Sequence, residues 1–88
     1  MGDTQTAIFV KLKTVMATIL KLDISEVDEM TSAKSSLKDD LGIDSVESLD
    51  FLASIENMFS ITIFDHEAPD LRTVQDVIDL IIKKQTVQ

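Results

Sequence analysis

Residues 44–60 read DSVESLDFLASIENMFS, and this stretch carries the clearest secondary-structure signal in the chain. Asp44 and Glu47 have the spacing of a capping box, with Asp in place of Ser or Thr at the N-cap. The apolar residues that follow form two adjoining stripes, at positions 46, 49, 52 and 53 and at positions 51, 55 and 59. The pattern predicts a helix that ends near Ser60. This helix is either buried over a wide arc, or one of its apolar stripes contacts a partner protein.

Two further amphipathic helices flank this one. The first is predicted from Asp3 or Thr4 to Lys21, because apolar residues recur at helical spacing at Ile8, Leu12, Val15, Met16 and Ile19. The last is capped by Thr73 and has its apolar face at Val74, Val77, Ile78 and Ile81. Lys83 and Lys84 follow at its C-terminal end, where positive charge suits the helix dipole.

Residues 22–43 form a long connection with its own apolar anchors, which we expect to close one end of a helical bundle: Val27, Met30, Leu37, Leu41 and Ile43. A brief helical turn after Ser25 is expected, and Gly42 indicates a tight bend before the next helix. Residues 61–64 alternate like a strand, but a four-residue strand has no partner here, so an extended connector is expected. Asp65 to Ala68 is expected to form one helical turn that Pro69 closes.

These elements predict an all-α fold, an up-and-down four-helix bundle with three main helices and a short third helix. The chain is expected to be a single domain over residues 1–88, since 88 residues support one core and leave little room for a second. Hydrophobic residues make up 44% of the sequence, which is enough for a modest core but not for a deep enzyme pocket.

The composition excludes several classes of function. Sixteen acidic residues against eight basic ones give a net charge of -8, without the clustered Lys and Arg that a nucleic-acid surface needs. We therefore expect protein partners with basic patches, found by electrostatic steering. The absence of cysteine excludes disulfides, thiolate metal sites and a cysteine nucleophile. No apolar run approaches the length of a membrane span, so no membrane insertion is expected.

The sequence contains no convincing set of catalytic or metal-binding residues. His66 is the only imidazole, and a triad of Ser45, His66 and a carboxylate would lack the nucleophile elbow and oxyanion loop. The acidic stretch from Asp39 to Asp50 does not fit a calcium loop, because its glycine falls at the wrong position. We expect no enzyme and no dedicated metal site. Ser45 itself is either a solvated helix start or the site of a phosphate ester beside free N–H groups.

Residues 39–49, DDLGIDSVESL, closely resemble the signature of the acyl carrier protein family. The resemblance extends to Glu56–Phe59, to residues 61–63 and to residues 73–76, and so covers nearly the whole chain. It implies that Ser45 receives 4'-phosphopantetheine from coenzyme A through a separate phosphopantetheinyl transferase that uses Mg²⁺. Asp44 would engage that transferase and its metal, and the thiol of the cofactor would carry acyl groups as thioesters.

The resemblance also implies two further sets of site residues. Enzyme partners (synthases, reductases and acyltransferases) would dock on Val46, Glu47, Asp50, Ala53 and Glu56. An acyl chain would lie among residues that could equally be ordinary core: Leu49, Leu52, Ile55, Ile63 and Leu71. The expected carrier is a cytoplasmic monomer of fatty acid biosynthesis or a related dedicated pathway. The alternatives are a polyketide, aminoacyl or specialised-lipid carrier, and an unmodified helical interaction module.

Several positions depart from the common pattern of that family. Val46 replaces the usual Leu after the serine, and Asn57 and Met58 occupy positions that are commonly glutamate. Phe64 stands where proline is common, and Pro69 appears in the region of the third helix. The first loop is also longer, by residues 29–34. Together these departures favour a specialised carrier that serves a dedicated pathway.

Overall fold

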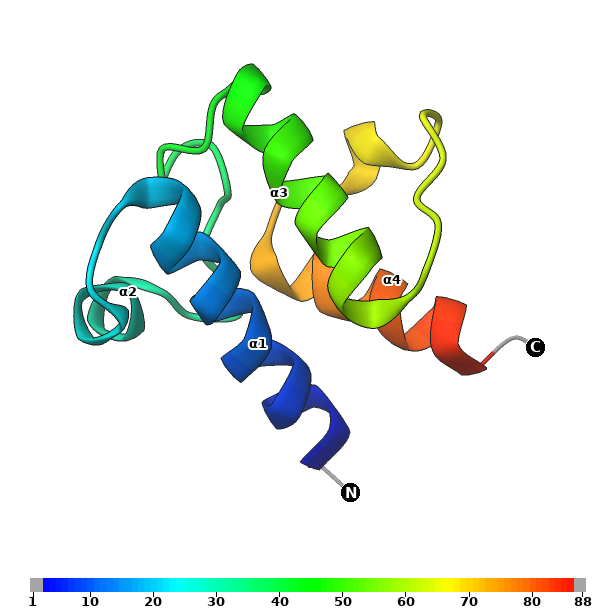
Figure 1. Ribbon diagram of the computed structural model, residues 1–88, viewed down its shortest axis with the longest axis horizontal. Coiled ribbons are helices and arrows are strands. Elements are labelled where there is room, and N and C mark those ends of the chain that lie inside the picture. The colour runs from blue at the N-terminus through cyan, green and yellow to red at the C-terminus, as the bar shows by residue number, and fades with distance from the viewer. Residues whose placement is uncertain (1–2, 87–88) are drawn as a thin grey trace.

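The computed structural model describes residues 3–86, apart from the side chains of Asp3, Ser45 and Thr86. Its α-helices are α1 (Asp3–Leu20), α2 (Ile24–Met30), α3 (Ser45–Phe59) and α4 (Val74–Thr86), with a 3₁₀ turn, η1, at Ala68–Asp70 (Figure 1). The described residues contain no strand, and one isolated β-bridge joins Ser36 to Thr73. The all-α helical bundle predicted from the sequence is confirmed.

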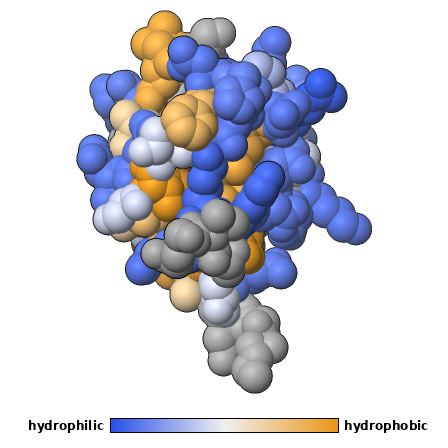
Figure 2. Space-filling view, turned by 90° about the vertical axis from the view of Figure 1, so that its right-hand side faces the viewer, coloured by the Kyte–Doolittle hydropathy of each residue, from blue (hydrophilic) through white to orange (hydrophobic). Residues whose placement is uncertain are grey.

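Helix α1 is the centre of the bundle and contacts each of the other three α-helices. It runs roughly opposite to α3 in Figure 1. The core forms where the apolar faces of the helices meet, and it includes the predicted faces of α1 (Ile8, Leu12, Val15, Met16), α3 (Phe51, Ile55, Phe59) and α4 (Val74, Val77, Ile78, Ile81). On the face shown in Figure 2 the surface is mainly hydrophilic, with hydrophobic residues showing between the polar ones.

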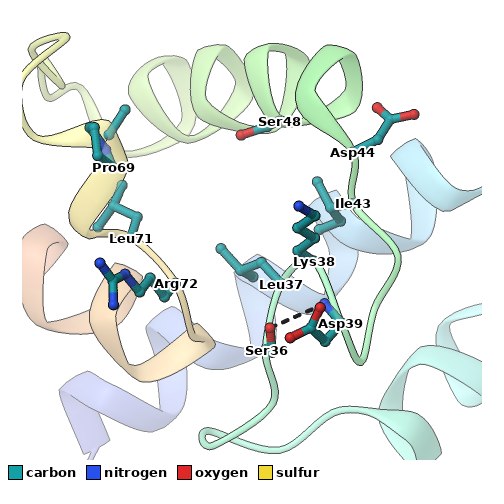
Figure 3. Close-up of a pocket in the computed structure, with 11 residues that line it drawn as sticks. Ser36, Leu37, Lys38, Asp39, Ile43, Asp44, Ser48, Pro69, Leu71 and Arg72 are labelled. Atoms are coloured by element: carbon teal, nitrogen blue, oxygen red, sulfur yellow. Dashed lines mark hydrogen bonds between the residues drawn. The ribbon is translucent and has the colours of Figure 1, made fainter.

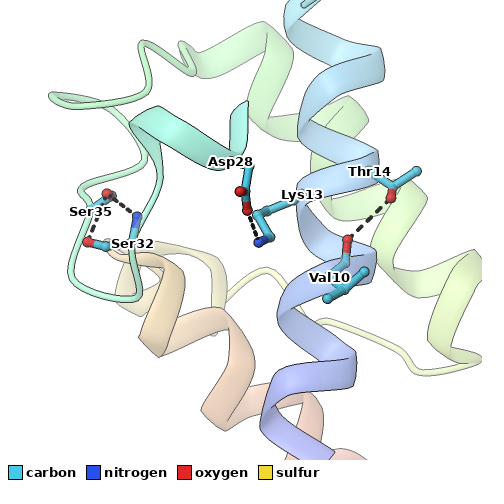
Figure 4. Close-up of polar contacts among 6 residues, drawn as sticks. All are labelled: Val10, Lys13, Thr14, Asp28, Ser32 and Ser35. Atoms are coloured by element: carbon cyan, nitrogen blue, oxygen red, sulfur yellow. Dashed lines mark hydrogen bonds and ion pairs between the residues drawn. The ribbon is translucent and has the colours of Figure 1, made fainter. Parts of the chain in front are cut away.

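Helix α2 differs from the brief turn expected after Ser25. It is seven residues long and begins at Ile24, because Asp23 is the N-cap and its carbonyl accepts the N–H of Glu26 and Val27. Val27 is fully buried. Lys13 of α1 also pairs with Asp28, so α2 is held to α1 by both apolar and charged contacts (Figure 4).

Met30 was expected to be an apolar anchor, and this prediction is wrong, since its side chain is 41% exposed. Helix α2 ends at Met30, and the chain continues in an extended conformation at Thr31. The side chain of Thr31 takes the interior position instead and is buried.

Residues 31–43 run alongside the start of α4 and then turn back towards α3. The N–H of Leu37 donates to the carbonyl of Arg72 at 2.9 Å, and the N–H of Gln75 donates to the carbonyl of Ala33 at 2.8 Å. Leu37, Leu41 and Ile43 are buried, as predicted. Gly42 has a φ of 71°, which glycine adopts at little cost, and it makes the predicted bend before α3.

The connection between α3 and α4 begins as the predicted extended connector over residues 61–64. The expected helical turn over Asp65 to Ala68 is wrong in its position. Residues 65–67 form a turn, and the helical segment is η1, which contains Pro69 instead of ending before it. Proline is tolerated there because the first N–H groups of a helical segment have no acceptor within it.

Candidate functional site

The start of α3 is fixed by a reciprocal cap. Asp44 Oδ1 accepts the N–H of Glu47 at 2.8 Å, and Glu47 Oε1 accepts the N–H of Asp44 at 3.4 Å. The capping box predicted from the sequence is confirmed. Ser45 is the first helical residue after this cap, and its side chain lies outside the described part of the structure.

A groove of about 460 Å³ lies beside this helix start, between α3, residues 36–39 and η1 (Figure 3). It is lined by apolar side chains, by two cations and by hydroxyl and carboxylate groups: Leu37, Ile43, Ala68, Pro69 and Leu71; Lys38 and Arg72; Ser36, Ser48, Asp39 and Asp44. Ser48 is directed into the groove, whereas Asp44 points away from it. The groove is therefore amphipathic, and its lining holds two cations and two carboxylates beside the position of Ser45.

This donor set fits a phosphopantetheine group. A phosphodiester is an anion, and ammonium and guanidinium groups are its usual partners. The pantetheine arm has amide and hydroxyl groups together with two methyl groups, which match the hydroxyls and the apolar side chains of the lining. The residues around the start of α3 are thus chemically suited to this cofactor.

The residues expected to dock partner enzymes lie mostly on the surface. Val46 is 71% exposed, and Asp50 and Ala53 are also exposed. Glu47, half-buried, lines a shallow depression between α3 and the end of α1 together with Asp50 and Ala53. Glu56 is half-buried too, and its Oε2 accepts the N–H of Ile63 at 2.8 Å, so this carboxylate also supports the connector.

The residues expected to surround an acyl chain occupy three different environments. Ile55 is fully buried in the core, whereas Leu52, Ile63 and Leu71 are half-buried and pack against it. Leu49 is 70% exposed and lies on the surface with Val46. Among these five, Leu71 is the one that reaches the groove beside Ser45.

Sequence reasoning missed the two cations of the groove, Lys38 and Arg72. Arg72 is the only arginine in the sequence, and Lys38 immediately precedes the acidic pair that opens the carrier signature. These are the signals that could have drawn attention to them. Their shared position depends on the β-bridge and hydrogen bonds that join residues 33–37 to residues 72–75, which no local pattern indicates.

His66 does not take part in this site. Its ring stacks on Phe64 with centroids 5.8 Å apart, and it is not among the residues that line the groove. Within residues 3–86, no group of three or more histidine or acidic side chains is placed to hold a metal ion. None of the helices in this part of the chain is long and apolar enough to cross a membrane.

The fold and site define a class of protein, the carriers with a phosphopantetheine attachment site, whose family model matches residues 10–81. Acyl carrier proteins are similar over nearly the whole chain. The one from an Exiguobacterium species is 40% identical over 81 residues, covering 92% of this chain and 98% of that protein. The one from Thermosynechococcus vestitus is 36% identical over 80 residues, covering 91% and 94%.

A solved structure agrees with these sequences. The acyl carrier protein of Thermotoga maritima superposes with a TM-score of 0.79 at 26% identity, covering 94% of this chain and 92% of that one. The chain belongs to the acyl carrier protein family. It is accordingly a carrier and not an enzyme, its cofactor is 4'-phosphopantetheine, and it works with partner enzymes.

Proposed function

We propose that this single-domain carrier is loaded on Ser45 and delivers acyl groups to the enzymes of fatty acid biosynthesis or of a related dedicated pathway in the cytoplasm. The observation that carries this proposal is the position of Ser45, directly after a complete capping box and beside an amphipathic groove with two cations. When bound, 4'-phosphopantetheine supplies the thiol on which acyl groups travel as thioesters.

In loading, Ser45 Oγ forms a bond to the phosphorus of the pantetheine phosphate of coenzyme A. The bond from that phosphorus to adenosine 3',5'-bisphosphate breaks, and the serine proton passes to a base of the transferase. Asp44 is exposed, and its Oδ1 is held by the N–H of Glu47. Its Oδ2 has no hydrogen-bond partner in the described part of the chain and is the oxygen we assign to the Mg²⁺ of the transferase.

The docking surface consists of Val46, Glu47, Asp50 and Ala53, with Glu56 at its edge. The carboxylates meet Lys and Arg of the transferase and of synthases, reductases and acyltransferases, while the exposed side chain of Val46 supplies apolar contact. The acyl chain is carried among Leu49, Leu52, Ile55, Ile63 and Leu71. This arrangement suits a monomer that exchanges rapidly between partners.

Two surface residues favour a dedicated pathway over a general one. Met58, at a position that is commonly glutamate, is 42% exposed, and Phe64, at a position that is commonly proline, is 53% exposed. Exposed apolar residues at these two positions would select partners with apolar complements.

Intact mass measurement tests the attachment. The protein is incubated with coenzyme A, Mg²⁺ and a broad-specificity phosphopantetheinyl transferase, with Ser45→Ala and Ser48→Ala treated in parallel. We expect the wild type and Ser48→Ala to gain one phosphopantetheine each, and Ser45→Ala to gain none. Loading of Ser45→Ala, or no loading of the wild type by several transferases, would refute the proposal.

A further inference from the structure

We infer that Phe64, Glu67 and Lys84 form a latch that fastens the extended connector over residues 61–64 to α4, and that the connector opens locally when this latch releases. The helices stay folded during this opening. Opening uncovers Ile63, which directly precedes Phe64 and is one of the residues proposed to surround an acyl chain. The latch itself stands apart from the proposed function, whereas its effect on an acyl chain rests on that proposal.

Three contacts join the residues of the latch in a closed set. Glu67 Oε1 accepts the N–H of Phe64 at 2.9 Å, and the same oxygen pairs with Lys84 Nζ at 2.8 Å. Lys84 Nζ in turn lies over the ring of Phe64, 4.6 Å from the ring centroid. Each residue of the latch therefore contacts the other two, and the loss of one contact weakens the others.

The ring of Phe64 lies on the solvent side of the ion pair. Phe64 is 53% exposed, whereas the side chains of Lys84 and Glu67 are only 20% and 17% exposed. The ring of His66 stacks on that of Phe64 with an angle of 5° between the two planes, which also restricts the movement of the phenylalanine. A proline at position 64 would provide neither the N–H nor the ring, so the latch depends on the phenylalanine.

The core contributes little to holding the connector, which forms part of a loop at the edge of the molecule in Figure 1. From Ser60 to Thr73 no side chain is fully buried, and Ile61 and Ile63 are half-buried against the core. The N–H of Ile63 is accepted by a side chain, Glu56 Oε2, at 2.8 Å, and not by a paired strand. A segment with few buried apolar contacts opens at a low cost in free energy.

Hydrogen exchange of the unloaded protein, followed by nuclear magnetic resonance, tests whether the connector opens locally. In the wild type we expect the N–H of Ile63 to exchange faster than that of Ile55, which is fully buried within α3. The exchange of Ile63 should hardly depend on dilute urea, because local opening exposes little surface. Equal rates and equal urea dependence for the two N–H groups would show that the connector opens only in global unfolding, and would overturn the inference.

Substitutions distinguish a latch from a set of independent contacts. Phe64→Leu keeps the N–H and removes the aromatic ring, and Lys84→Gln removes the charge. Each should speed the exchange of the Ile63 N–H by about two- to fivefold, whereas Lys34→Gln, at an exposed position outside the connector, should not. The double variant Phe64→Leu/Lys84→Gln should speed it by less than the product of the two single effects. Effects that multiply would mean two independent contacts and would overturn the latch.

The effect on an acyl chain is measured by cleaving thioesters of the loaded protein with hydroxylamine. The nitrogen of hydroxylamine forms a bond to the acyl carbon, the bond from that carbon to sulfur breaks, and the released thiolate takes up a proton. The rate of this reaction reports how often the thioester is accessible. An octanoyl thioester should be cleaved faster in Phe64→Leu and in Lys84→Gln than in the wild type. An acetyl thioester, whose chain is too short to lie beside Ile63, should be cleaved at the same rate in all three proteins.

The outcomes separate this inference from the proposed function. Octanoyl cleavage at the same rate in all three proteins would overturn the effect of the latch on an acyl chain. Failure of the wild type to load at all would overturn the proposed attachment and this effect together. The exchange of the Ile63 N–H in the unloaded protein would still decide whether the latch exists.

Discussion

Thr31 illustrates how a single side chain can lower the stability of this fold. Its hydroxyl is buried at the end of α2 and has no hydrogen-bond partner among the described residues. An unsatisfied buried hydroxyl costs about 1–3 kcal/mol, because the group loses its hydrogen bonds to water without replacement. Thr31 is extended, with a φ of −117°, which a β-branched residue adopts readily.

Thr31→Val should therefore raise the free energy of unfolding by about 1 kcal/mol, since a methyl group replaces the unpaired hydroxyl at equal volume. Thr31→Ser is the matched control. It keeps the hydroxyl and loses a buried methyl group, and we expect it to lower stability by about 1 kcal/mol. Urea unfolding measures both variants. A destabilised valine variant would show that the hydroxyl finds a partner in solution.

Ser60 is strained at the end of α3, where it adopts a left-handed conformation with a φ of 55°. Glycine reaches this conformation without a steric penalty and is the usual residue at such helix ends. Ser60→Gly should raise the melting temperature, with a gain in stability of about 1 kcal/mol. Ser60→Val, which is β-branched, should lower it. Equal melting temperatures for the glycine and valine variants would refute the strain argument.

At the scale of elements, carboxylate side chains fix the connector between α3 and α4 by accepting its backbone N–H groups. Glu56 of α3 accepts the N–H of Ile63, and Glu67 accepts the N–H of Phe64 at 2.9 Å. Glu67 also pairs with Lys84 of α4 at 2.8 Å. These contacts tie the connector to both neighbouring helices, and through it they place η1 and Leu71 at the edge of the groove.

The ion pair makes the stability of this element depend on pH. Lys84, and then the N–H of Phe64, lower the pKa of Glu67 below its ordinary value of 4.5. Because the pKa is depressed in the folded state, the pair stabilises the protein above pH 4.5, and this contribution is lost as the pH falls through the folded-state pKa.

Lys84→Gln should therefore be less stable than the wild type at pH 7, and the two proteins should converge in acid. Thermal melting at a series of pH values measures the difference, and titration of the Glu67 carboxyl by carbon-13 resonance should show its pKa rising in the variant. Lys34→Gln removes the same charge from an exposed position and serves as the control. A difference that persists at low pH would assign the loss to packing against Phe64 instead.

At the scale of the whole molecule, the net charge of -8 influences the rate at which the protein associates with charged partners. A strongly acidic protein is steered towards basic surfaces, and this long-range attraction weakens as salt rises. General steering depends on total charge, whereas docking depends on where the charges lie. Substitutions of equal charge at different places separate the two effects.

Glu47→Lys/Asp50→Lys should lower kcat/KM for loading by the transferase at least about tenfold at low salt, with a smaller effect at high salt. Glu26→Lys/Glu29→Lys makes the same change in net charge at exposed positions of α2, outside the residues of the proposed docking surface, and should have a much smaller effect. Loading assays over a range of salt concentrations compare the two pairs. Equal effects would show that net charge alone matters.

Local sequence patterns are enough to predict the three long helices, the cap of α3 and the position of Ser45 at its start. These features follow from contacts between residues three or four positions apart, as in the pair Asp44 and Glu47, so a local pattern reports them. Most buried positions were also predictable, because apolar residues at helical spacing have one face to bury.

Features in which distant segments meet could not be predicted in this way, because they depend on how the chain packs in three dimensions. The side chain of Met30 is exposed and that of Thr31 is buried because α2 ends where the chain must turn back to α4. Pro69 lies inside η1 because the N–H that proline lacks is not needed there. Lys38 and Arg72, 34 positions apart in the sequence, share one groove because the backbone of residues 33–37 pairs with that of residues 72–75. Such pairing depends on how the helices pack, and no periodicity within either segment encodes it.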